Sequence, residues 1–243
     1  MEQQEQQRQL VMQEQRMADQ IEKKVITASY QNKGAENGNF CALSLTSADS
    51  MADVVMVGFA GLEGSVLLAQ KKEEELKKRY ASSFIKRAAK QSAELVDAAQ
   101  LQRSEEIAPF LMTKETEAAA AGWSDVCGLC ELGRAGVFMG LWNIAQAADV
   151  GLEIILQQIP VKQETIEICN FFDINPYQLQ SGNSWILFSH HGNRTVQQLA
   201  GLGIAATVIG LTMANHDRVI INGEERRFLG KRYQDPFELL IAE

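Results

Sequence analysis

The segment of residues 53–59, DVVMVGF, constrains the fold more than any other part of the sequence. It is β-branched and nearly all apolar, which predicts a strand that is covered on both faces of its sheet. Between residues 110 and 230, further strand patterns alternate with helix patterns, and this alternation indicates an α/β or α+β sandwich. The expected fold class is therefore α/β, with a sheet that has layers packed against it.

Composition and charge exclude several classes of protein. The chain has 243 residues, of which 46% are hydrophobic, enough for one large domain or two small ones with a buried core. It carries 23 Lys and Arg against 31 Asp and Glu, a formal net charge of −8, and no basic stretch is interleaved with aromatic residues. Nucleic acid is therefore not an expected partner.

Membrane and export signals are also missing from the sequence pattern. The longest apolar runs are interrupted and fall short of the roughly 20 residues that a membrane helix needs, so no membrane partner is expected. The Gln-rich, acidic start has neither an apolar signal core nor an Arg-rich transit pattern. These features predict a cytoplasmic protein.

Four cysteines, Cys41, Cys127, Cys130 and Cys169, occur without an export signal and are expected to be reduced. Cys127 and Cys130 form a C-x-x-C, which suits a redox pair or half of a zinc site. No second such pair follows, and the three histidines are distant in sequence. We therefore expect no metal site, and small loop residues that pack at this point.

The first half of the chain contains a tail, a short strand and helical segments. Residues 1–24 are rich in Gln and Glu, which predicts a polar helix or a flexible tail, and a Gly- and Asn-rich stretch then marks a boundary. A short strand is expected over residues 40–46. After the strand of residues 53–59, a long helix is expected to open at Gly64 and Ser65, with Glu73 and Lys77 spaced i,i+4.

The second half begins with residues 127–136, CGLCELGRAG, which predict a glycine-punctuated loop that leads into a helix. The other expected elements are helices over residues 113–121, 137–150, 162–172 and 195–202, the last capped by Asn193 or Thr195, strands over 152–156, 185–190 and 205–211, and a hairpin over 218–229 around Asn222 and Gly223.

A family resemblance rests on three segments. Residues 136–182, GVFMGLWNIAQAADVGLEIILQQIPVKQETIEICNFFDINPYQLQSG, are very similar to the carboxy-terminal domain of the AIR synthase-related family, in its hydrogenase maturation factor branch. Residues 53–80 resemble the strand and helix that link that family's two domains, and residues 215–229 its closing hairpin. The resemblance implies a tail with a remnant strand over residues 1–50, a linking strand and long helix over 51–108, and an AIR synthase-like carboxy-terminal domain over 109–243.

The sequence departs from the family pattern in three places. The family's amino-terminal domain holds ATP and metal and dimerises through a β-barrel, but the first 50 residues here lack its acidic, Gly-rich motif. The family loop His-Asp-Val-Thr-Glu-Gly-Gly aligns with Cys130 to Gly136, so Glu131 stands at the position of the Asp and only Gly136 is intact. The terminal cysteine of the hydrogenase maturation factor is absent as well. The resemblance thus implies a truncated protein with impaired catalysis.

The resemblance also implies a ligand site. Backbone N–H groups at the start of a helix attract phosphate, so Gly133, Arg134 and Gly136 are expected to bind phosphate, with Arg134 as a forked donor. Ser181 and Gly182 match part of a family turn near the ligand. ATP and Mg are the cofactors that the resemblance implies, and no catalytic residue is assigned beyond the position of Glu131.

Three functional hypotheses follow. The chain is a catalytically impaired, ligand- or partner-binding module of this family, or an active ATP-dependent phosphoryl-transfer enzyme of the synthetase or dehydratase type that a second chain or a dimer completes. A decayed copy without a selected role fits the same residues. Under the first two hypotheses, a second copy or another protein is expected to cover an exposed sheet edge or apolar patch.

Overall fold

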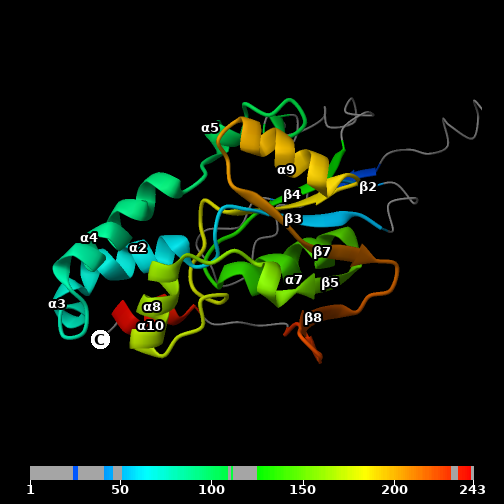
Figure 1. Ribbon diagram of the computed structural model, residues 1–243. Coiled ribbons are helices and arrows are strands. Elements are labelled where there is room, and N and C mark those ends of the chain that lie inside the picture. Colours follow the sequence, from blue (N-terminus) through cyan, green and yellow to red (C-terminus); the bar gives the residue numbers. More distant parts are fainter. Residues whose placement is uncertain are drawn as a thin grey trace, which may run out of the picture.

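A computed structural model describes residues 24–26, 41–45, 51–108, 111, 125–230 and 235–241. Within these residues, nine strands form one sheet (Figure 1). The strands are β1 (Lys24–Ile26), β2 (Cys41–Leu45), β3 (Asp53–Val57), β4 (Val126–Glu131), β5 (Gly151–Ile155), β6 (Trp185–Ser189), β7 (Ala206–Met213), β8 (Arg218–Asn222) and β9 (Glu225–Phe228). Their order is β1-β2-β4-β6-β3-β7-β5-β8-β9, and only the β5–β8 pair is parallel among these described strands.

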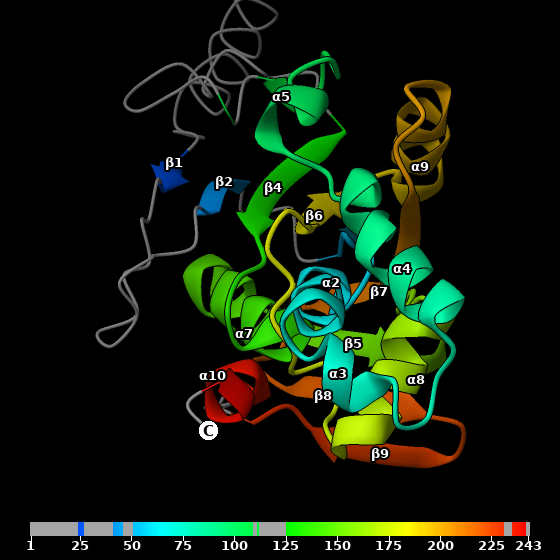
Figure 2. The same cartoon turned by 90° about the vertical axis from the view of Figure 1, so that its left-hand side faces the viewer.

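Helices lie on both faces of this sheet and beyond one end of it (Figures 1 and 2). The α-helices are α2 (Leu62–Lys71), α3 (Glu73–Leu76), α4 (Ser82–Lys90), α5 (Ala98–Leu101), α7 (Gly136–Ala148), α8 (Gln163–Phe172), α9 (Gly192–Gly201) and α10 (Pro236–Ile241), and the 3-10 helices are η1 (Gln91–Glu94) and η3 (Leu156–Gln158). None of the helices in the described ranges is long and apolar enough to cross a membrane.

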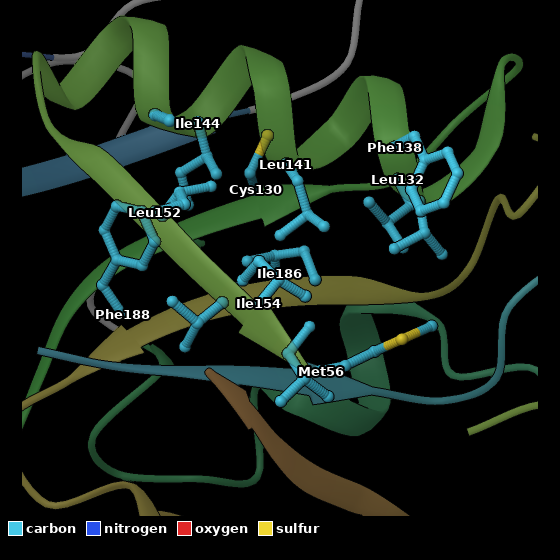
Figure 3. Packing of buried hydrophobic residues seen from close by; sticks show 14 of the residues in the cluster. Met56, Cys130, Leu132, Phe138, Leu141, Ile144, Leu152, Ile154, Ile186 and Phe188 are labelled. Atoms are coloured by element: carbon cyan, nitrogen blue, oxygen red, sulfur yellow. The ribbon is translucent and has the colours of Figure 1, made fainter. Parts of the chain in front are cut away.

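Strand β3 lies inside the sheet and is buried on both faces, as its sequence predicts. Val54 and Met56 belong to the cluster that α7 covers, which Figure 3 shows from close by. Val55 and Val57 belong to a second cluster on the opposite face, which includes residues of α5 and α9. The expected α/β sandwich is confirmed, and the two faces of β3 are its centre.

A third cluster holds the helices that extend beyond the sheet. Its buried members come from α2, α3, α4, α8 and α10, together with Leu179 of a connecting segment. Figure 1 shows these helices grouped past one end of the strands. The cluster matters for function because it anchors the start of α2 and the connecting segment next to the end of the sheet.

The long helix expected from Gly64 is wrong in its start and its length. Helix α2 begins two residues earlier, at Leu62, and ends at Lys71. Lys72 leaves helical geometry, with φ −114° and ψ 30°, and α3 begins directly after it. The carboxylates that open α3 favour a new helix start, because negative charge stabilises the amino end of a helix. The expected Glu73–Lys77 ion pair is present, at 3.0 Å.

The loop expected over residues 127–136 is also wrong in its first half, because residues 127–131 belong to strand β4. Gly128 is the reason. A Cβ atom there would lie 2.9 Å from Leu43 Cδ2 and 3.2 Å from Phe188 Cδ2. Glycine in a strand marks a close approach of neighbouring groups as well as a turn, and here it permits tight packing inside the sheet.

The cysteines follow the expectation only in part. Cys127 and Cys169 are not disulfide-bonded, and burial raises the pKa of Cys169 to about 12. Cys130 is disulfide-bonded, so the expectation of a reduced cysteine is wrong at this position. Cys41 of β2 lies directly opposite Cys130 in the antiparallel ladder. Pairing between distant strands creates this proximity, which no local sequence pattern records.

The remaining expectations divide between confirmed and untested ones. The hairpin is confirmed, with Asn222 opposite Glu225 and Gly223 at φ +63°. The expected cap of α9 is wrong, because the helix begins at Gly192, whose N–H donates to Asp53 Oδ2 at 2.8 Å. The expected helix over residues 113–121 and residues 1–23 of the expected tail lie outside the described residues, and Lys24, the last residue of that tail, begins strand β1. The three domain boundaries stay a prediction, although strands of all three segments share the sheet.

Candidate functional site

The residues expected to bind ligand lie at one end of the sheet. Strands β3 and β4 both run antiparallel to β6, so they point in the same direction. Val57 of β3 and Glu131 of β4 both pair with Trp185, which places the carboxyl ends of the two strands together. Helices α2 and α7 begin directly after these ends. Ligand sites of α/β proteins commonly form at such strand ends.

Helix α7 begins at Gly136, which has a left-handed φ of +68°. A Cβ atom at this position would lie 2.6 Å from the carbonyl oxygen of Tyr177 and 2.7 Å from that of Leu179. The Gly136 N–H donates to the Arg134 carbonyl at 2.5 Å, and the Phe138 N–H donates to the Tyr177 carbonyl at 3.2 Å. Two donors in the first turn of α7 are therefore already bonded to main-chain oxygens.

Helix α2 begins after Gly61, which is also left-handed, with φ +66°. The Gly61 N–H donates to Ser181 Oγ at 2.8 Å, and the Ser181 hydroxyl in turn donates to the Leu179 carbonyl at 2.8 Å. The Gly64 N–H donates to the Gln180 carbonyl at 3.0 Å. Residues 176–184, named here the bridging segment, thus supply partners to the starts of both helices.

The carboxylate of Glu63 closes the start of α2 from the side. Its Oε2 atom accepts hydrogen bonds from the Gly182 N–H and from the Gln180 side-chain amide, both at 2.8 Å. The next residue, Asn183, is left-handed at φ +55° and directs its N–H to the Glu131 carboxyl. Consecutive N–H groups of the bridging segment therefore hold two different carboxyl groups.

The electrostatics of this place are acidic. Burial raises the pKa of Glu131, the Asn183 N–H lowers it, and the nearby charge of Glu63 raises it again. Burial outweighs the hydrogen bond, because the charged form loses water that one donor does not replace. A phosphate that approached the Gly182 N–H would meet Glu63 in its place and Glu131 beside it.

Arg134 does not point its charge at this place. Its Nη1 atom lies 2.5 Å from Glu238 Oε1 of α10, so a carboxylate of the chain already holds the guanidinium. Gly133 is closer to the centre, because its carbonyl accepts the Ser181 N–H at 3.0 Å. The peptide of residues 133–134 is therefore tied to the bridging segment, while the Arg134 side chain is tied to α10.

The structure brings all six predicted site residues into one neighbourhood, and it adds residues that the sequence reading missed. The predicted residues are Glu131, Gly133, Arg134, Gly136, Ser181 and Gly182; their roles in binding phosphate or substrate stay predictions. The added residues are Glu63, Gln180, Asn183, Asp235 and Glu238. Glu63 had a readable signal, because an acidic residue favours the first helical turn. That signal was missed because the helix was expected to begin one residue after it.

These residues fit ATP and Mg poorly. The N–H groups of Gly136 and Gly182 and the Nη1 atom of Arg134 are engaged within the chain, and the charge of Glu63 acts on the Glu131 carboxyl. Across the described parts of the chain, no group of three or more His, Cys, Asp or Glu residues is arranged to hold a metal ion. We therefore derive no reaction step that uses a nucleotide or a metal.

Comparisons with known proteins identify the fold. No family model and no curated protein matches the sequence. Among solved structures, E. coli HypE, a hydrogenase maturation protein, matches with a TM-score of 0.55 and 17% identity over 78% of this chain and 52% of that one. HypE in complex with ATP matches with a TM-score of 0.52 and 18% identity over 77% and 52% of the two chains.

A structure of the HypE–HypF complex matches at a TM-score of 0.50 and 16% identity, over 75% of this chain and 53% of that chain. The chain thus spans about half the length of the solved structures it matches. At these identities the likeness establishes the fold alone. It confirms the predicted AIR synthase-like α/β fold class.

Proposed function

We propose that this chain is a hydrogenase maturation factor-like protein of the AIR synthase-related family, catalytically impaired, that acts as a ligand- or partner-binding module. The observation that carries the proposal is the internal occupation of the expected phosphate site. Glu63 accepts the Gly182 N–H, main-chain carbonyls accept two N–H groups in the first turn of α7, and Glu238 is paired with Arg134. A catalyst of phosphoryl transfer needs such donors aimed at the developing charge.

The acidic pair adds a second argument against phosphoryl transfer. Glu63 and Glu131 face each other closely enough for the charge of one to raise the pKa of the other. A triphosphate without bound cations would add repulsion to the cost of breaking the Glu63 hydrogen bonds. The position between Glu63 and Glu131 therefore suits a cationic or neutral ligand group better than an isolated phosphate.

An exposed apolar surface supports the partner-binding half of the proposal. Phe228 of β9 is 74% exposed and Ile155 of β5 is 37% exposed. The register Glu153–Val219–Phe228 places Phe228 on the face opposite the buried Leu152 and Ile154, which is also the face of Ile155. Exposed apolar residues on one sheet face mark interaction surfaces. A second copy or another protein that covers β9 and β5 would bury them.

Titration with ATP and Mg, together with an assay of phosphate release, tests the proposal directly. The expected result is no binding in the micromolar range and no release of phosphate. The matched control is Glu131→Gln, which removes one of the two charges and is also expected to release no phosphate. Micromolar binding with turnover by the unmodified chain would refute the impaired module.

The alternative is an active ATP-dependent phosphoryl-transfer enzyme that a second chain or a dimer completes. It is favoured by two facts: HypE has been solved in complex with ATP, and this chain spans about half of that protein's length. Under this alternative the complementary chain would supply the nucleotide-binding residues. Co-purification with a chain that restores ATP hydrolysis would support it, and no restoration by any candidate chain would count against it.

A further inference from the structure

Helix α10 is packed against the candidate site from outside the sheet. Phe237 is buried in the third hydrophobic cluster, which also contains Leu68 of α2 and Leu179 of the bridging segment. The ammonium group of Lys71 lies 5.5 Å from the centre of the Phe237 ring. Figure 1 shows α10 grouped with α2 and α8 past one end of the strands. Residues 235–241, named here the α10 strap, are thus held by one buried aromatic side chain and by polar contacts.

The main polar contact is the ion pair between Arg134 and Glu238. Its two charged atoms are 2.5 Å apart, but the side chains are 43% and 58% exposed. An ion pair at this exposure contributes little, because water competes for both charges. A stronger anion can therefore displace Glu238 at small cost.

A second polar group in the strap is the carboxyl of Asp235, and docking of the strap is unfavourable when this carboxyl is charged. Asp235 is only 6% exposed, and its Oδ1 accepts the Phe237 N–H at 3.0 Å. Its Oδ2 is buried without a hydrogen-bond partner. A buried, incompletely bonded carboxylate is unfavourable, whereas the protonated acid is tolerated.

We propose that the α10 strap is an autoinhibitory contact: Glu238 occupies one side of the Arg134 guanidinium, so a phosphate-bearing anion competes with Glu238 and binds Arg134 more tightly when the strap is displaced. The inference rests on the proposed ligand-binding function, in which Arg134 is the one cationic side chain among the expected phosphate-binding residues. It adds a regulatory element to that function. Displacement would free the guanidinium while α7 and the bridging segment keep their main-chain contacts.

Hydrogen exchange of the full chain without ligand tests the docking itself. Glu238→Gln and Arg134→Gln each remove the ion pair, so the amides of residues 237–241 are expected to exchange about two- to five-fold faster. Glu224→Gln, an exposed glutamate at the β8–β9 turn, is the matched control and should leave that exchange unchanged. Unchanged exchange in both ion-pair variants would contradict the proposal that the Arg134–Glu238 pair holds the strap in place.

Titration with inorganic tripolyphosphate tests the link to ligand. Glu238→Gln is expected to bind it about two- to five-fold more tightly than the unmodified chain, and the double variant with Arg134→Gln should lose that gain. Equal affinity with and without Glu238 would overturn autoinhibition. Absence of binding in every variant would overturn the anion role of Arg134. Neither result depends on ATP turnover, so failure here is distinct from failure of the proposed function.

The pH dependence of the exchange gives a third test. Burial raises the pKa of Asp235 to about 6. The nearby charge of Glu238 also raises this pKa, whereas the N–H groups of Phe237 and Gln180 and the charge of Arg134 lower it. A raised carboxyl pKa means that the docked strap holds the proton more tightly, so this contribution to docking is complete below the ordinary aspartate pKa and is lost as the pH rises through about 6. After correction for intrinsic exchange rates, protection of residues 237–241 should fall from pH 5 to pH 7 in the unmodified chain and stay constant in Asp235→Asn. The opposite trend would overturn this role of Asp235.

Discussion

Helices α7 and α2 start with the same backbone device and are completed in different ways. Gly136 and Gly61 have nearly the same left-handed φ, +68° and +66°. At the start of α7, main-chain carbonyls accept the Gly136 and Phe138 N–H groups. At the start of α2, one main-chain bond from Gly64 to Gln180 is joined by two side-chain contacts: Ser181 accepts the Gly61 N–H, and Glu63 accepts the Gly182 N–H. Main-chain partners cannot change without moving the chain, but side-chain partners can be replaced. The start of α7 is therefore structural, and the start of α2 is where binding properties can change.

The largest expected effect is on α7. Gly136→Ala should lower the free energy of unfolding by about 3 kcal/mol or more, because it adds the cost of a left-handed alanine to contacts under 3 Å with two carbonyl oxygens. Chemical denaturation measures this. Gly201→Ala in α9 is the control, since a Cβ there meets nothing within 4 Å, and a gain of up to about 1 kcal/mol is expected. A tolerated Gly136→Ala would refute the structural role of this helix start.

An intermediate effect is expected at Ser181. Ser181→Ala should cost about 1 to 3 kcal/mol, because it leaves the buried N–H of Gly61 without its acceptor. The control is Ser92→Ala, because Ser92 is exposed. Its free energy of unfolding, measured by chemical denaturation, should change by less than about 0.5 kcal/mol. If both serine variants behaved alike, the side-chain closure of α2 would be unimportant for stability.

A smaller effect on stability is expected at Glu63. Glu63→Gln keeps an acceptor for the Gly182 N–H and removes the charge, so the free energy of unfolding should change by less than about 1 kcal/mol. The same change should lower the pKa of Glu131, because the charge of Glu63 raises it. Titration of the Glu131 carboxyl by NMR would show this shift. The exposed variant Glu105→Gln should leave that pKa unchanged.

The smallest effect is the pH dependence from Glu131. Its raised pKa means that the folded chain binds this proton more tightly than the unfolded chain. Its contribution to stability is therefore present below the ordinary glutamate pKa and is lost as the pH rises through the raised value. Glu131→Gln should flatten the stability profile over that range. A profile that becomes steeper in the variant would contradict the assignment.

The comparison of the two helix starts also shows what the sequence could reveal. The buried strand β3, helix α7 and the Asn222-Gly223 hairpin carry strong local patterns, and they were predicted. The six expected site residues lie in one neighbourhood, and the family resemblance is what allowed the sequence to predict them together. At strand β4 the sequence pattern predicts a loop, because glycine is typical of turns. In the structure Gly128 instead permits the side chains of Leu43 and Phe188 to pack closely against the strand.

Contacts between distant segments explain the other failures. Glu238 reaches Arg134 across 104 positions, and Glu63 reaches Gly182 across 119 positions. No local spacing or propensity encodes either contact, since both depend on how α10 and the bridging segment pack against the helix starts. Opposite charges in a sequence also pair in many ways. Only the folded arrangement shows that the donors expected for a ligand are taken by the chain itself.

The most direct test of internal occupation is a paired titration of the unmodified chain and Glu63→Gln with inorganic pyrophosphate. The account predicts that Glu63→Gln binds pyrophosphate more tightly than the unmodified chain, because the variant removes the negative charge beside the Gly182 N–H. Micromolar binding to the unmodified chain, or tighter binding there than to Glu63→Gln, would contradict it.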